Sequence, residues 1–189
     1  MKFPLVLGVS ARHLHLSTSD MAKLFGEEAE LHPKKYIEQP GQYAAEEQVT
    51  LVTAKGKMNL RVIGPLRKAT QIELSMTDAR ALGLKPPIRI SGNIENSPGG
   101  HLIGPKGEIE LDKGIIIAAR HIHLCPATAT KYGLKNGDVL DVKTTGERSL
   151  TFHGVPVRTG EEHADEFHID TDEANACGLA NGVIIEVSK

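Results

Sequence analysis

Two histidine pairs in this sequence have the residue types and the spacing of metal ligands. Both lie in the pattern Ala-Arg-His-x-His-Leu, which supplies His13 and His15 near the start and His121 and His123 in the second half. Each copy follows an apolar run that predicts a β-strand, and side chains at i and i+2 of a strand point to the same face. Because neutral imidazole is a ligand for zinc and its first-row neighbours, the duplicated motif predicts a metal site.

Other side chains of similar chemistry could complete this site. His168 and Glu73 each alternate with apolar residues, as they would in a half-buried strand. For Glu73 a solvated strand face is the alternative, and His153 and His163 are reserve ligands. Histidines with a carboxylate and no thiol cluster favour a catalytic site, because structural zinc sites usually use cysteine.

Three further residues could bind an anion or attack an acyl group. Arg67 follows a Gly-Pro turn, where its guanidinium could hold phosphate or carboxylate through paired hydrogen bonds, although an exposed basic loop has the same composition. Ser91 precedes Gly-Asn and could offer a hydroxyl beside backbone N–H groups. Cys125 follows the second histidine pair, but the first copy has Ser17 there, so we interpret Cys125 as a small packed thiol.

Composition excludes several classes of function. The 189 residues carry a net charge of −2 and no basic stripe, which argues against a nucleic-acid or anionic-membrane partner. No apolar run is long enough to span a bilayer, and the N-terminus lacks the pattern of a signal peptide. The two cysteines do not form a CxxC motif, so we expect a reduced, cytoplasmic protein.

A second repeat predicts the fold class. Ala-x-x-x-Gly-Leu followed by a turn and an apolar strand occurs three times, beginning at Ala79, Ala129 and Ala174. Each copy predicts a short helix with a glycine C-cap and then a strand, and residues 91–114 resemble a loop between related halves. We therefore expect a mainly β protein of two barrels with short helices, because the helices are too short and too few for βαβ units.

Several motifs together resemble one family along essentially the whole chain. They lie at residues 8–16, 64–67, 70–75, 91–92, 97–99 and 119–123. With them the chain resembles the PduL-like phosphate acyltransferases (phosphate propanoyltransferase, phosphotransacylase). The resemblance implies an enzyme with two zinc ions at the junction of two β-barrels capped by short helices. It also implies a first barrel from residues 1–12 plus 115–189 and a central barrel from residues 13–114.

The resemblance implies roles for particular residues and partners. The metal ligands would be His13, His15, Glu73, His121, His123 and His168. Arg67 and Ser91 would be the catalytic and phosphate-binding residues. The partners would be coenzyme A or acyl-CoA and phosphate, and a homodimer is left open. Relatives that are targeted to microcompartments carry an N-terminal extension. Here the family core begins almost at Met1, so we expect either a free cytoplasmic form or a chain from which such an extension was removed, and this weakens an assignment to propanediol degradation.

For the mechanism, we hypothesise metal-assisted, direct attack of phosphate on the thioester of acyl-CoA. A covalent route through Cys125 is the less favoured version. Two other classes remain as alternatives: a metal-dependent thioester or ester hydrolase, and a protein whose metal only stabilises the fold. The residues leave the acyl chain length open between acetyl and propanoyl.

Overall fold

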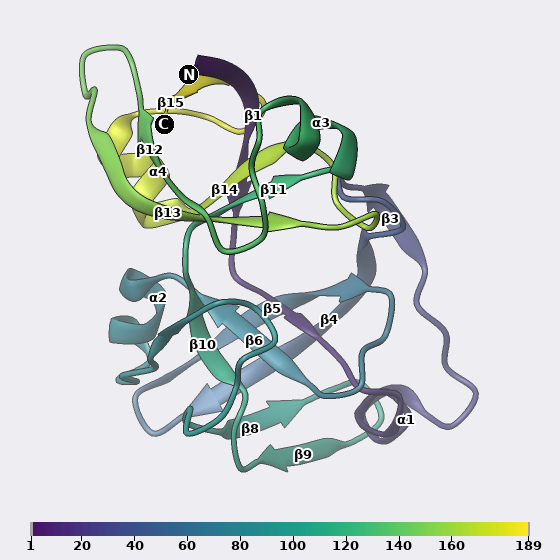
Figure 1. The fold of residues 1–189 in the computed structure, drawn as a ribbon. Coiled ribbons are helices and arrows are strands. Elements are labelled where there is room, and N and C mark those ends of the chain that lie inside the picture. The colour runs from purple at the N-terminus through teal and green to yellow at the C-terminus, as the bar shows by residue number, and fades with distance from the viewer. Residues whose placement is uncertain (1, 189) are drawn as a thin grey trace. The chain divides into compact units, whose positions relative to one another are not determined.

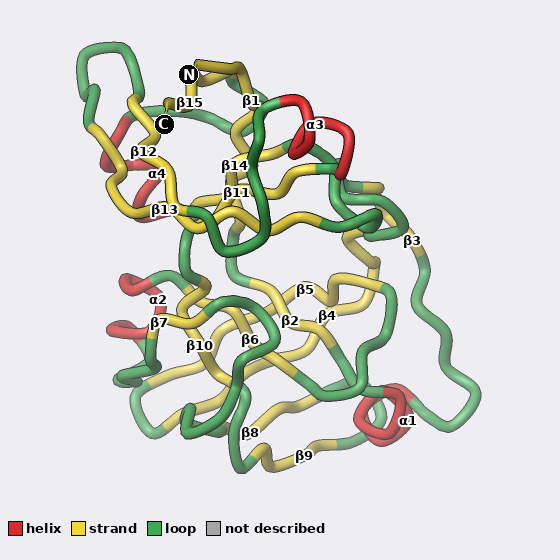
Figure 2. Tube along the Cα trace, viewed as in Figure 1, coloured by secondary structure: helices red, strands yellow, loops and turns green. Residues whose placement is uncertain are grey.

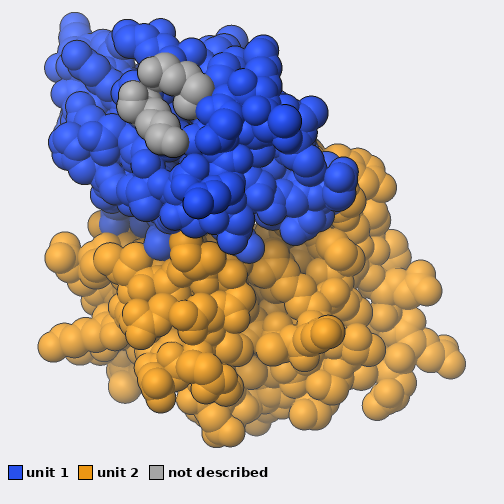
Figure 3. Space-filling model, in the orientation of Figure 1, with its two compact units in different colours: residues 1–11, 38–40, 119–189 blue, residues 12–37, 41–118 orange. Residues whose placement is uncertain are grey.

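The computed structural model describes residues 2–188. Contacts within the chain divide it into two compact units, coloured separately in Figure 3. The described part of unit 1 comprises residues 2–11, 38–40 and 119–188, and unit 2 comprises residues 12–37 and 41–118. Figure 1 labels most elements of both units, and each unit has its own buried apolar cluster.

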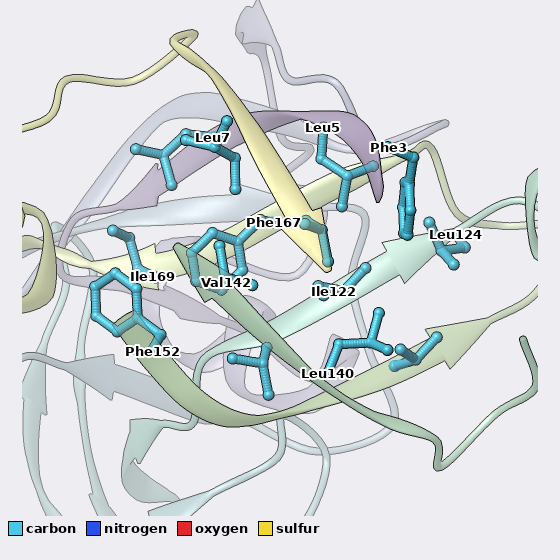
Figure 4. Packing of buried hydrophobic residues seen from close by; sticks show 14 of the residues in the cluster. Phe3, Leu5, Leu7, Ile122, Leu124, Leu140, Val142, Phe152, Phe167 and Ile169 are labelled. Atoms are coloured by element: carbon cyan, nitrogen blue, oxygen red, sulfur yellow. The ribbon is translucent and has the colours of Figure 1, made fainter. Parts of the chain in front are cut away.

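Unit 1 contains a closed barrel of six strands in the order β1-β14-β11-β13-β12-β15. Its strands are β1 (Lys2–Ser10), β11 (His121–Leu124), β12 (Val139–Lys143), β13 (Thr151–Thr159), β14 (Glu166–Asp170) and β15 (Ile184–Ser188). Apolar and exposed residues alternate along the start of β1, so that Phe3, Leu5 and Leu7 point inward. In Figure 4 these side chains gather with Phe167 inside the barrel, whose closure leaves no unpaired edge.

Unit 2 contains a nine-stranded sheet in which eight strands follow the order β7-β10-β6-β2-β5-β4-β8-β9 and β3 pairs with β4. Its strands are β2 (His13–His15), β3 (Pro33–Tyr36), β4 (Tyr43–Thr53), β5 (Gly56–Gly64), β6 (Gln71–Leu74), β7 (Ile88–Arg89), β8 (Gly100–Ile103), β9 (Glu108–Leu111) and β10 (Ile115–Ala118). The expected fold class is confirmed: the protein is mainly β with short helices, and the closed barrel of unit 1 is accompanied in unit 2 by a half-barrel sheet that ends at β7 and β9.

The helices of residues 2–188 are all short, as Figure 2 shows in red. They are α1 (Thr18–Phe25), α2 (Met76–Ala81), α3 (Pro126–Lys131) and α4 (Thr171–Cys177). The repeated alanines Ala79, Ala129 and Ala174 lie buried in α2, α3 and α4, which confirms the helix repeat. None of the helices within residues 2–188 combines the length and the apolar character needed to cross a membrane.

The N-terminus of α4 offers a test of local stability. The Asp170 side chain accepts a hydrogen bond from the Glu173 backbone N–H at 2.9 Å, and the Glu173 side chain caps the Asp170 backbone in return. We expect Asp170→Ala to lower the stability of unit 1 by about 1 kcal/mol and its Tm by roughly 2–4 °C. Thermal unfolding would measure this, with Glu161→Ala at an exposed position as the control; equal shifts in both variants would contradict the cap's role.

The chain changes unit immediately before each histidine pair. β1 belongs to unit 1 and is followed by β2 in unit 2, and β10 belongs to unit 2 and is followed by β11 in unit 1. The run Ile115–Ala118, which the sequence analysis places in the first barrel, instead pairs as β10 with β6 and β7 in the sheet of unit 2. Each histidine pair therefore lies in a different unit from the apolar strand that precedes it.

Candidate active site

Strands β2 and β6 bring the first histidine pair next to a carboxylate in unit 2. They are antiparallel neighbours, with His13 opposite Glu73 and His15 opposite Gln71. The four side chains share one face of the sheet, because residues two apart in a strand and residues directly opposed across two strands lie on the same face. The apolar residues between them point the other way, into the core of unit 2.

His13, His15 and Glu73 form a group that could hold a metal ion. One ligand atom from each lies within 4.8 Å of the other two. Nε2 of His13 is 3.6 Å from one Glu73 oxygen, and Nε2 of His15 is 3.9 Å from the other. Nδ1 of His15 lies 3.0 Å from the carbonyl oxygen of Ile63, a contact in which the ring donates and which fixes its orientation.

The electrostatics of this group favour the ionisation states that a metal needs. Burial, together with the charges of His13 and Arg67, lowers the pKa of His15 to about 3. Burial alone would raise the pKa of Glu73, but the charges of the two histidines and a hydrogen bond from Ser91 lower it to about 2. At neutral pH His15 is therefore neutral, with a lone pair to donate, and Glu73 is an anion.

Hydrogen bonds connect Glu73 to the predicted phosphate-binding residues. The Ser91 hydroxyl donates to Glu73 Oε1 at 2.8 Å, and Nη1 of Arg67 donates to Ser91 Oγ at 3.2 Å. Gln71 lies between them and donates from Nε2 to Glu73 Oε1 at 2.6 Å and to Ser91 Oγ at 2.8 Å. Arg67 and Ser91 thus belong to the same cluster as Glu73, and their roles toward phosphate stay predictions.

Strands β11 and β14 repeat this arrangement in unit 1. They are antiparallel neighbours, with His121 opposite His168 and His123 opposite Glu166. The ring centroid of His168 lies 5.0 Å from that of His121 and 4.8 Å from that of His123. The structure therefore brings the three predicted histidine ligands of this unit together on one face of the barrel wall.

His163 adds a fourth ring to the cluster of unit 1. It stacks on His123, with the centroids 3.9 Å apart and the planes 7° from parallel. Within residues 2–188, both ring nitrogens of His123 and Nδ1 of His163 are buried without a hydrogen-bond partner. Burial is the main reason why the pKa of each ring lies below its usual value, so both are neutral at pH 7. Buried, neutral, unpaired nitrogens are costly unless something binds them, which fits a metal ion held at His123.

Glu166 and Gln39 are candidate functional residues that the sequence analysis did not find. The Glu166 carboxylate lies 2.7 Å from Nε2 of His168 and accepts a hydrogen bond from Gln39 at 2.7 Å. Burial opposes its ionisation, but the hydrogen bond from His168 lowers the pKa of Glu166 below its usual value. A carboxylate in this place fixes the orientation of the His168 ring, as carboxylates beside metal-binding histidines do in known sites.

A substitution of Gly8 tests whether the Glu166 carboxylate holds the His168 ring in place. Gly8 lies opposite His168 across β1 and β14, and a Cβ atom at this position would overlap the Glu166 carboxylate. We expect Gly8→Ala to displace the carboxylate from His168 and to weaken zinc binding about 10-fold, as measured by competition with a chelating dye. Gly56→Ala is the control, because a Cβ there meets no atom within 4 Å; equal zinc affinities in the two variants would contradict the expected displacement.

The surroundings of His153 and Cys125 do not match the roles that the sequence analysis considered for them, a metal ligand and a nucleophile. His153 is exposed, and its Nδ1 lies 2.8 Å from an oxygen of Asp141 rather than in either histidine cluster. The thiol of Cys125 lies 3.5 Å from the hydroxyl of Thr128. A hydroxyl is not a base that would ionise the thiol, so the covalent route through Cys125 gains no support from this contact.

Comparison with known proteins adds the remaining observation. Residues 6–180 match the sequence model of the family described as phosphate propanoyltransferase. The chain belongs to this family. The phosphate propanoyltransferase of Rhodopseudomonas palustris is 51% identical over 188 residues, which cover 99% of this chain and 83% of the relative. Those of Thermotoga maritima (51% identical; 97% of this chain, 88% of the relative) and Salmonella typhimurium (48%; 94% and 85%) are also similar. The phosphate propanoyltransferase resemblance is thereby confirmed, and the chain is an enzyme of the phosphate acyltransferase type.

Proposed function

We propose that this protein moves a short acyl group between coenzyme A and inorganic phosphate, in the reaction acyl-CoA + phosphate = acyl phosphate + CoA. The family match over residues 6–180 is the observation that carries this proposal. Its site offers what the reaction requires, because a guanidinium that suits phosphate is hydrogen-bonded through Ser91 to a carboxylate in a metal-ligand cluster.

Arg67 binds the phosphate, and Ser91 orients it by fixing the Arg67 guanidinium, from which it accepts a hydrogen bond. One phosphate oxygen attacks the carbonyl carbon of the thioester, the carbon–sulfur bond breaks, and the electron pair leaves with the sulfur of CoA as a thiolate. Thiolate is a good leaving group, so the step needs no strong general acid. Direct attack also needs no acyl-enzyme, which is consistent with the surroundings of Cys125.

We assign two zinc ions as cofactors, one to His13, His15 and Glu73 and the other to His121, His123 and His168. The first set offers three ligand atoms within 4.8 Å of one another, and the second includes His123, both of whose nitrogens are buried and unpaired among the described residues. When bound, such ions supply Lewis acidity and neutralise charge on the reactants. Neutral imidazoles and one carboxylate are a donor set that suits zinc.

The test is the release of CoA thiol from acetyl-CoA and propanoyl-CoA by zinc-loaded protein, with and without phosphate. Release that requires phosphate and forms acyl phosphate is the expected result, and the ratio of the two rates would identify the preferred acyl group. Chelation should abolish the release and zinc should restore it. Release that is independent of phosphate would instead favour a hydrolase.

A further inference from the structure

Gln71 is a buried polar residue to which the proposed reaction gives no role. Its side chain is on the same face of β6 as Glu73, and the residue is 3% exposed. The backbone N–H of Gly92 donates to Oε1 of Gln71 at 2.7 Å. Because this contact requires the oxygen, it fixes the orientation of the amide and directs the Nε2 group to the opposite side.

Both hydrogens of that Nε2 group are used. One is donated to Glu73 Oε1 at 2.6 Å and the other to Ser91 Oγ at 2.8 Å. A primary amide has two such hydrogens, so the donor capacity of Gln71 is filled by these two residues.

The donor and acceptor roles of the Ser91 hydroxyl follow from the number and type of its partners. Its oxygen accepts from Nε2 of Gln71 and from Nη1 of Arg67, and both of these nitrogens can only donate. Two acceptor positions are thereby filled, so the hydroxyl hydrogen is left for Glu73 Oε1 at 2.8 Å. Ser91 consequently joins the guanidinium to the carboxylate in one defined arrangement.

We propose that Gln71 is a positioning residue for acyl transfer to phosphate, which acts through Ser91 to hold the Arg67 guanidinium in a fixed relation to Glu73. This inference rests on the proposed function. Without the amide, the Ser91 hydroxyl loses one of its three hydrogen-bond partners, so the oxygen that accepts from Arg67 is held less firmly.

The cluster of unit 1 supports this reading independently. Glu166 takes the place there that Gln71 takes in unit 2, since each lies two residues before a predicted ligand and opposite the second histidine of a pair. Glu166 likewise contacts that ligand, His168, at 2.7 Å. Both clusters thus have a buried side chain at this position that holds the neighbouring ligand.

The experiment measures the KM values for phosphate and for acyl-CoA in Gln71→Met, Ser91→Ala and the double variant. Methionine keeps the volume of glutamine but lacks its donors and acceptor. We expect Gln71→Met to raise the phosphate KM about 10-fold, with less than a twofold change in the acyl-CoA KM. Because Gln71 acts through Ser91, adding Gln71→Met to Ser91→Ala should raise the phosphate KM less than twofold further.

Gln48→Met is the matched control, since Gln48 is an exposed glutamine on β4; it should change neither KM, alone or with Ser91→Ala. An unchanged phosphate KM in Gln71→Met, or effects of Gln71→Met and Ser91→Ala that multiply, would overturn the inference. If Gln71→Met does not fold, Gln71→Asn serves instead, because the shorter amide cannot reach Gly92 and Ser91 together. Absence of phosphate-dependent release in the parent protein would refute the proposed function itself, a result distinct from any difference among variants.

Discussion

Glu73→Gln is expected to remove most phosphate-dependent CoA release and to weaken metal binding by unit 2. The substitution keeps the shape of the side chain and an acceptor for Ser91, but it removes the negative charge that faces His13 and His15. Loss of residues that merely support a metal ligand costs about 10–100-fold in metal affinity, so loss of the ligand charge should cost roughly 100-fold or more. We expect the turnover rate to fall on the order of 1,000-fold.

Equilibrium zinc binding and steady-state kinetics measure the two effects of Glu73→Gln. The metal-free variant should be no more stable than the parent at neutral pH, because the pKa of Glu73 is lowered to about 2, which means that the folded protein stabilises its carboxylate. Glu46→Gln, an exposed carboxylate on β4, is the control and should bind zinc normally. Parental zinc affinity and parental turnover in Glu73→Gln would exclude Glu73 as a ligand.

Arg67→Ala is expected to raise the KM for phosphate roughly 10–100-fold, because charge-assisted hydrogen bonds from a guanidinium contribute about 1.5–3 kcal/mol. The Arg67 backbone is held by a hydrogen bond from its N–H to the carbonyl oxygen of Leu16 at 2.8 Å, so the loop should survive the loss of the side chain. Arg67→Lys should recover little, since an ammonium cannot reproduce the planar pair of donors.

Lys68, the next residue in the chain, provides the matched control for the Arg67→Ala experiment. Lys68 is an exposed cation in the same loop, so Lys68→Ala removes the same charge from nearly the same place. We expect it to leave the phosphate KM within about twofold of the parental value, because exposed charges are screened. A similar rise in both variants would mean that the loop attracts phosphate only through its net charge.

The period-2 pattern of the sequence was sufficient to predict how each histidine pair is presented. His13 and His15 share a face because the strand rule is local. Glu73 was a candidate from its alternation with apolar residues, and the family resemblance strengthened it. Gln71 lies in the same stretch as Glu73, yet its role depends on contacts with Ser91 and Gly92, which come from another segment of unit 2. Contacts with a turn so distant in the sequence are not encoded in a local pattern.

Other features of the fold could not be predicted from the sequence for similar reasons. Gln39 is 127 residues from Glu166 in the chain, and no pattern marks the segment 38–40 as part of unit 1. How far a sheet closes depends on whether its end strands meet, so the sequence of β7 and β9 did not reveal that the sheet of unit 2 is a half-barrel.

The early position of β1 in the chain has a consequence for synthesis on the ribosome. This strand emerges first, but its barrel neighbours β14 and β15 are the last two strands to be translated. All strands of unit 2 lie between residues 13 and 118, so its sheet has every strand available while the barrel still lacks most of its wall. The usual N-to-C order of folding is therefore reversed for the first strand, which must wait for the end of translation before it can be paired.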